Sequence, residues 1–142
     1  MKNVGLILLM FILSTSVQAQ KKYFNVHNTP AQIEEFVKQH FGDHEIIYTK
    51  KKTNSKRTKY KTRLDNKVKL EFDENFRPKE IEAKNGLPNS VVSEKIRDYV
   101  KQNYPNQKIV EWERKKDQRQ EVELANGIEL IFDRDDNFLK ID

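Results

Sequence analysis

Three histidines include the only pair whose spacing resembles a metal site. His40 and His44 stand four positions apart, as in a zinc pair on one helix face, and His27 is the third histidine. However, Gly42 lies between them and is expected to end the helix, and no glutamate follows His40 as it does in H-E-x-x-H. We therefore expect polar surface residues at a helix end and no metal site.

A second pattern resembles the beginning of a calcium-binding loop. Asp133, Asp135 and Asn137 alternate as in the first half of an EF-hand, but Phe138 occupies the position that requires glycine. No glutamate follows at the twelfth position, because the sequence ends at Asp142. We expect a polar turn between two strands, and weak calcium binding at this turn remains open.

Nucleophilic and phosphate-binding motifs are missing from the sequence. Ser55, Ser90 and Ser93 have no flanking nucleophile motif, and the four glycines form no phosphate-binding loop. The chain of 142 residues has no cysteine, which excludes disulfide frameworks, thiolate metal sites and thiol catalysis. We expect a protein that is not an enzyme and that has no cofactor.

The segment Lys50–Arg63 is the strongest charge feature. It holds eight basic residues among fourteen and no acidic residue, within a chain whose net charge is only +5. Three interpretations compete: a solvated hairpin, a surface for an anionic protein, lipid or polysaccharide, and a nucleic-acid site. We do not expect nucleic acid as a partner, because the aromatic residues are not interleaved as stacking platforms.

The N-terminus has the three features of a secretory signal peptide in order. A positive start precedes the ten apolar residues Val4–Leu13, and a small-x-small pattern ends at Ala19. The apolar run is too short for a transmembrane anchor, which needs about 20 residues. The sequence predicts a signal peptide over residues 1–19, a linker over 20–28, and a periplasmic or secreted protein.

The rest of the chain repeats itself. Residues 36–41 (FVKQHF) match 99–104 (YVKQNY) at an offset of 63, and residues 64–73 match 124–133 at an offset of 60. Two matches in the same order indicate an internal duplication. We expect a single domain made of repeat 1 (29–85) and repeat 2 (86–142). Repeat 1 with its linker is basic, whereas repeat 2 has more acidic than basic residues, and this polarity permits self-association.

Each repeat is expected to begin with a helix. Thr29 and Gln32 form a capping box around Pro30, and either Asn89 or Ser90 is expected to cap the second helix. Apolar residues follow both caps at helical spacing. Gly42 and Pro105 are expected to stop the two helices.

Strands should follow each helix, because apolar and charged residues alternate with a period of two. A three-residue loop, residues 125–127, places Leu124 opposite Ile128 and puts Gly127 in the left-handed position of a bulge. Pro78 indicates an edge strand or a bulge, and Trp112 should pack inward with Val110. The predicted fold is α+β: a tandem repeat of one helix and about four antiparallel strands, with both helices on one face of a sheet of up to eight strands.

The face of this sheet without helices is the expected binding surface. In the predicted register Arg63 lies opposite Lys69, and Glu123 lies opposite Glu129, so that like charges meet. The candidate contacts are Lys56, Arg57, Lys59, Lys61, Arg63, Lys69, Glu121, Glu123, Glu129 and the solvent-side Ile131.

The duplicated motifs resemble those of the exported bacterial PepSY-like family, also described as β-lactamase-inhibitor-like. The resemblance is clearest at Val100–Tyr104, Ile109-Val110, Leu124–Asp133 and Asn137–Asp142, and Lys67 replaces the turn glycine in repeat 1. It implies a tandem repeat whose sheet presents a concave face and a non-catalytic periplasmic or secreted role. Inhibitor-like proteins of this shape would bind an enzyme across that face, although this chain lacks the disulfide cysteines and the aromatic-rich open face of the β-lactamase inhibitor.

Two functions follow as expectations. The first is a binding module that engages a protein partner of the cell envelope, such as a peptidase or other hydrolase, through the open face. The second is an envelope-surface protein that holds anionic lipid or polysaccharide through Lys50–Arg63.

Overall fold

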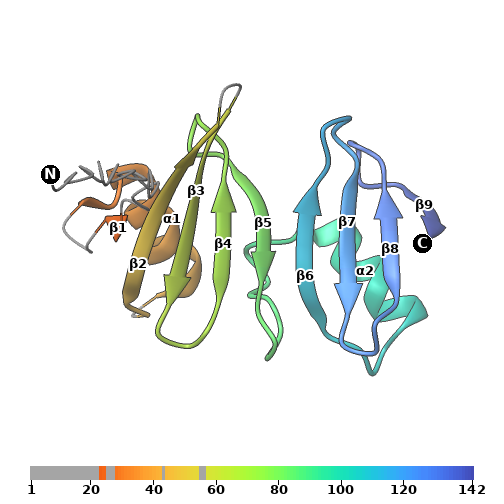
Figure 1. Ribbon diagram of the computed structural model, residues 1–142. Helices are drawn as coiled ribbons and strands as arrows, with labels where there is room; N and C mark the ends of the chain where they lie inside the picture. The colour runs from red at the N-terminus through yellow and green to blue at the C-terminus, as the bar shows by residue number, and fades with distance from the viewer. Residues whose placement is uncertain (1–22, 25–27, 43, 55–56) are drawn as a thin grey trace, which may run out of the picture.

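The computed structural model describes residues 23–24, 28–42, 44–54 and 57–142, which form two helices and an antiparallel sheet (Figure 1). The helices are α1 (Ala31–Phe41) and α2 (Glu94–Asn103). The strands are β1 (Tyr23–Phe24), β2 (Ile46–Thr53), β3 (Thr58–Leu64), β4 (Lys69–Phe72), β5 (Pro78–Glu82), β6 (Ile109–Arg114), β7 (Gln120–Leu124), β8 (Glu129–Phe132) and β9 (Phe138–Ile141). None of the helices among the described residues is long and apolar enough to cross a membrane.

The sheet runs in chain order from β1 to β9, and every neighbouring pair is antiparallel. Both helices lie behind the sheet in Figure 1, so that the other face carries no helix. The predicted α+β fold is confirmed, and the two-residue strand β1 is one strand more than expected. The predicted signal peptide and His27 lie outside the described residues.

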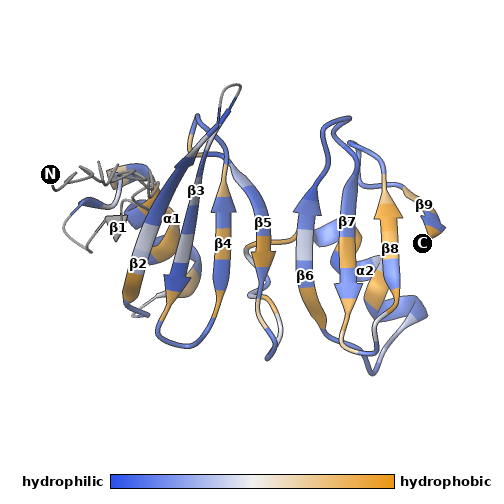
Figure 2. Ribbon diagram, in the orientation of Figure 1, coloured by the Kyte–Doolittle hydropathy of each residue, from blue (hydrophilic) through white to orange (hydrophobic). Residues whose placement is uncertain are grey.

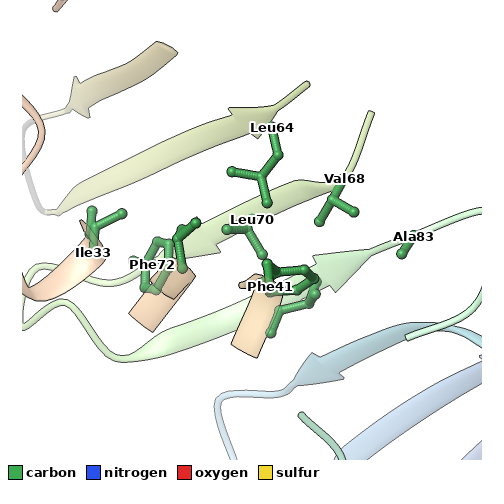
Figure 3. Packing of buried hydrophobic residues seen from close by; sticks show 9 residues of the cluster. Ile33, Phe41, Leu64, Val68, Leu70, Phe72 and Ala83 are labelled. Carbon is green, nitrogen blue, oxygen red and sulfur yellow. The ribbon is translucent and has the colours of Figure 1, made fainter. Parts of the chain in front are cut away.

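The core consists of two clusters that repeat the same packing. In repeat 1 the ring of Phe36 meets Phe72 edge-on at 5.3 Å, and in repeat 2 Tyr99 meets Phe132 edge-on at 5.4 Å. Figure 3 shows the first cluster, where Phe72 and its neighbours fill the space between the sheet and α1. Trp112 packs against both clusters and therefore joins the two repeats. The internal duplication is thus visible in matching contacts as well as in sequence.

The hairpin turns follow the predicted three-residue loop. The amide of Leu124 donates to the carbonyl of Ile128, and Gly127 has a φ of 84°. The equivalent residue in repeat 1, Lys67, adopts the same left-handed region with a φ of 70°. Since Gly has no Cβ to strain this conformation, the turn in repeat 2 is the more relaxed of the two.

The predicted helix caps are wrong. Thr29 does not cap α1, because its hydroxyl donates to Thr49 Oγ1 of β2 at 3.0 Å. Ser93, not Asn89 or Ser90, caps α2 by accepting the amide of Ile96. The hydroxyl of Thr29 can bond either to the start of its own helix or to a residue distant in sequence, and in the folded chain it bonds to the distant residue.

Two bulges modify the strand predictions. The register shifts between Ile109 and Glu111, so that Ile109 packs with Trp112 against the core in place of Val110. Pro78 lies at a second irregularity, opposite Phe72, and its strand β5 is central, paired with β4 and β6. The prediction of a bulge at Pro78 is confirmed, and the alternative of an edge strand is wrong.

Candidate binding face

The sheet face opposite the helices, which we call the open face, carries two ladders of side chains that run across the strands. Residues that are directly paired on neighbouring strands point to the same face, so each chain of paired residues forms one row across the sheet. The first ladder is Lys50, Lys61, Glu71, Glu80, Glu113, Glu121, Ile131 and Lys140, and the second is Tyr48, Arg63, Lys69, Glu82, Glu111, Glu123 and Glu129. Core residues such as Leu70 and Val122 alternate with them and point to the helices.

Charge divides the open face into two parts. The basic half, on β2 to β4, is Lys50, Lys52, Lys59, Lys61, Arg63 and Lys69. The acidic half, on β5 to β8, is Glu80, Glu82, Glu111, Glu113, Glu121, Glu123 and Glu129. Figure 2 shows hydrophilic residues along much of β2 and β3. The predicted pairings of Arg63 with Lys69 and of Glu123 with Glu129 are confirmed.

Glu71 is a buried carboxylate at the boundary between the halves, with only 4% of its surface exposed. Lys59 Nζ and Lys61 Nζ each lie 2.8 Å from its oxygens, and Lys79 Nζ lies at 3.9 Å. Burial alone would raise the pKa of Glu71, but the hydrogen bonds from Lys59 and Lys61 outweigh burial and lower it. Two of the predicted contact residues are therefore engaged in holding an internal carboxylate.

The acidic half has two internal counter-charges among the described residues, Lys115 and Lys69. Lys115 bridges Glu113 and Glu121 at 2.7 and 2.9 Å, and Lys69 meets Glu82 at 2.5 Å. The remaining four members form no ion pair with any described residue: Glu80, Glu111, Glu123 and Glu129. The strands of this half therefore present negative charge that a cation from outside can neutralise.

Glu111 lies at the centre of this uncompensated charge. Burial raises the pKa of its carboxyl, and the nearby carboxylates of Glu80 and Glu123 raise it further, to about 7. Glu82 and Glu113 act in the same direction. A positive partner over this position would relieve the repulsion between the glutamates.

Ile131 is not a surface contact. Its position on the open face was predicted correctly, but only 3% of its surface is exposed, so the expectation of a solvent-side residue is wrong. Lys115, Lys140 and other long side chains line the hollow around it, and their methylene groups can cover an apolar residue while their charged ends reach water. Lys56, another predicted contact, lies outside the described residues.

The residues expected not to bind metal have other partners. His40 Nδ1 lies 3.0 Å from Ser90 Oγ, and His44 Nδ1 lies 2.9 Å from Asp65 Oδ1. Asp133 accepts the amides of Asp135 and Asn137, which makes a closed polar turn. A carboxylate cluster appears elsewhere instead.

That cluster joins two predicted contact residues to the last residue of the chain. The carboxylates of Glu121, Glu129 and Asp142 bring oxygen atoms within 4.8 Å of one another. Sequence reasoning named Glu121 and Glu129 as contacts but did not place Asp142 beside them. The pairing of β8 with β9 could have indicated this position, because it places Asp142, which follows β9, beside Glu129. The amide of Asp142 donates to the carbonyl of Glu129.

A groove of about 610 Å³ lies where the β2–β3 and β6–β7 hairpins approach the β4–β5 turn. Its basic side chains are Lys52, Arg57, Lys59, Arg77, Lys79, Arg114, Lys115 and Lys116, against three acidic ones, Glu71, Asp73 and Glu74. Lys52, Arg57 and Lys116 form no ion pair with the described residues. Repeat 2 thus adds cations to the basic segment that the sequence alone assigned to repeat 1.

Comparisons with known proteins agree on one family. A family model described as "Putative beta-lactamase-inhibitor-like, PepSY-like" matches residues 15–79 and again residues 59–140. No curated protein matches the chain.

Three solved structures resemble the whole fold. The first, a "putative calcium-regulated periplasmic protein" from Bacteroides thetaiotaomicron, is 33% identical with a TM-score of 0.79, and the match covers 85% of this chain and 95% of that one. The second, a "putative periplasmic protein from DUF2874 family" from Bacteroides vulgatus, is 35% identical with a TM-score of 0.77 and coverage of 88% and 99%. The third, a "putative periplasmic protein of unknown function" from the same species, is 31% identical with a TM-score of 0.76 and coverage of 82% and 94%. Their description as periplasmic agrees with the localisation predicted from the sequence.

Proposed function

The chain belongs to the PepSY-like family, and on this basis we propose that it is a non-enzymatic binding protein of the cell envelope that engages a protein partner through its open face. The observation that carries the proposal is the acidic half, where Glu80, Glu111, Glu123 and Glu129 have no ion pair within the described chain. A stable sheet gains nothing from like charges placed directly opposite one another, so their presence favours a role in binding.

The partner proposed for this face carries a positively charged segment. Charge complementarity speeds encounter and excludes partners of the wrong sign more than it adds affinity. A peptidase or other hydrolase of the envelope with a basic rim around its site would fit this description. The family description as inhibitor-like is consistent with such a partner.

Calcium is the proposed regulator of the same face. A structure 33% identical to this chain is described as calcium-regulated, and Glu121, Glu129 and Asp142 converge here. Carboxylate oxygens are the ligands that calcium prefers. Calcium bound there would neutralise part of the acidic half and would weaken binding of a cationic partner.

Crosslinking in the native envelope tests the proposal. Wild-type protein should capture a reproducible partner at about pH 8, where Glu111 is mostly ionised. Under these conditions Glu111→Gln with Glu123→Gln should lower the yield about tenfold, because two central charges are lost. Capture should be stronger in EDTA than in calcium.

The matched control is Glu34→Gln with Glu35→Gln, which removes the same charge from the exposed surface of α1. Equal loss in the control, or capture that is unchanged in the face variant, would contradict the proposal.

A second candidate function is anchoring to an anionic surface, and the groove between the hairpins favours it. Its eight basic and three acidic side chains come from both repeats, so the cations are concentrated at one end of the sheet. Phosphate and carboxylate groups of lipid or polysaccharide would bind such a groove through long-range attraction and direct ion pairs.

The test replaces Lys52, Arg57 and Lys116 by Gln, which spares the lysines that hold Glu71. At low salt, retention of this variant on vesicles rich in phosphatidylglycerol, or on an acidic polysaccharide, should be about tenfold below that of wild type. At high salt, wild type itself should no longer be retained. Replacing Lys38, Lys84 and Lys101 by Gln gives the same charge change outside the groove. If that control loses as much retention, net charge and not the groove is responsible.

A further inference from the structure

The two repeats carry opposite charges at structurally equivalent positions of the open face. Arg63 and Lys69 are paired across β3 and β4, and Glu123 and Glu129, 60 positions later, are paired in the same way across β7 and β8. Lys61 and Glu121 form a further reversed pair in the other ladder. Duplication has preserved the backbone geometry and reversed the sign.

We propose that the open face binds a second copy of this chain, with the basic half of each copy over the acidic half of the other. The arrangement requires a two-fold axis that runs parallel to the strands, between the two stacked sheets. Rotation about that axis reverses the order of the strands and keeps the level of each ladder, so β2 to β4 of one copy face β6 to β8 of the other. An axis across the strands would instead place like charges on like charges.

Charge complementarity selects the second copy as the occupant. The acidic half needs positive charge at the spacing of neighbouring strands. The basic half of the same molecule supplies it at that spacing through Arg63, and through Lys61 and Lys69, which also pair with Glu71 and Glu82 of their own chain. Both contacts close at once in a two-fold pair, so a dimer forms in preference to an open chain of copies. The contact is built from half-buried and exposed charges that still reach solvent, so it weakens as salt shortens the range of attraction.

This inference rests on the proposed use of the open face for binding. It adds a mechanism of regulation, because a partner must displace the second copy to reach the acidic half. A chain at high local concentration would shield its own face, and a partner with a stronger positive segment would open the dimer.

A charge-swap experiment on the purified full chain tests the pairing, by sedimentation equilibrium in EDTA at low and high salt. One variant carries Arg63→Glu and Lys69→Glu, which makes both halves acidic. The other carries Glu123→Lys and Glu129→Lys, which makes both halves basic. Each variant alone should associate about a hundredfold more weakly than wild type, and their mixture should form a heterodimer at least as tightly as wild type.

Circular dichroism establishes that each variant is folded before its association is measured. Wild type that remains monomeric at low salt, or a mixture of the two variants that fails to associate, overturns the inference. The chain with all four substitutions separates this inference from the proposed function. It should still form homodimers, because its halves remain complementary in charge. It should no longer bind a cationic partner at β7 and β8, because Glu123 and Glu129 have been replaced there by lysines.

Discussion

Replacing Trp112 by Ala should lower the free energy of unfolding by about 3 kcal/mol, the lower end of the range for truncating a large aromatic residue in a core, because Trp112 is only partly buried. Trp112 packs against the buried clusters of both repeats, so its loss opens a cavity at their junction. Its indole Nε1 also donates to Gln120 Oε1 at 2.9 Å, and that acceptor would lose its partner. Urea unfolding followed by circular dichroism measures the change, since Trp112 is the only tryptophan and fluorescence would be lost with it.

Trp112→Phe is the matched variant, because it keeps an aromatic ring at the junction and removes the indole N–H. It should cost less than half as much as Trp112→Ala. Leu139→Ala serves as a surface control, since Leu139 is half exposed on β9. A loss of less than about 1 kcal/mol for Trp112→Ala would mean that the two clusters hold together without it.

Glu111 should make the stability of the fold depend on pH. Its pKa in the folded chain is about 7, against an ordinary value of 4.5, because of burial and the surrounding glutamates. Between these values the folded chain holds a proton that the unfolded chain releases. The stabilising contribution is therefore complete below about pH 4.5, and it is lost as the pH rises through 7.

Glu111→Gln removes this dependence, because the amide does not ionise. At about pH 8 the variant should be about 1–2 kcal/mol more stable than wild type, a figure reduced for the partial exposure of the carboxyl to solvent. At about pH 5 the two should differ little. Thermal unfolding across this range measures the effect, with Glu35→Gln on α1 as the control. Parallel curves for wild type and Glu111→Gln would contradict the assignment of the acidic centre to Glu111.

Much of the fold was predictable because short-range patterns determine it. The alternation on either side of residues 125–127, together with their parity, was enough to place Leu124 opposite Ile128 and Glu123 opposite Glu129. The helix starts were not predictable in the same way. Thr29 has a good local motif, but its hydroxyl meets Thr49, twenty positions away, once β2 lies beside the start of α1.

Only the parts of the candidate site that lie within a single hairpin, β3–β4 or β7–β8, were predictable from the sequence. Glu121, Glu123 and Glu129 lie in one hairpin, so alternation alone places them on the open face. Glu82 and Glu111 join them only because the last strand of repeat 1 pairs with the first strand of repeat 2. Nothing within either repeat specifies that pairing.

The alternation of apolar and charged residues also did not predict which side chains on the open face are buried. The period of two identifies the face on which Glu71 and Ile131 lie, but it does not show that lysine side chains from other strands gather around both. Long cationic side chains can shield a carboxylate or an isoleucine equally well, because they offer both methylene groups and charge.

The order of the sheet has a consequence for how the open face forms during folding. Because the strands pair in chain order, most pairings form between segments adjacent in sequence and require only short loops to close. The β5–β6 pairing is different, since residues 83–108, including α2, separate its strands, just as α1 lies between β1 and β2. The acidic half straddles that junction, so a chain with only one repeat folded lacks the complete row of glutamates. If the open face binds as we propose, binding requires both repeats to be folded and paired, so chains with only one folded repeat would not bind.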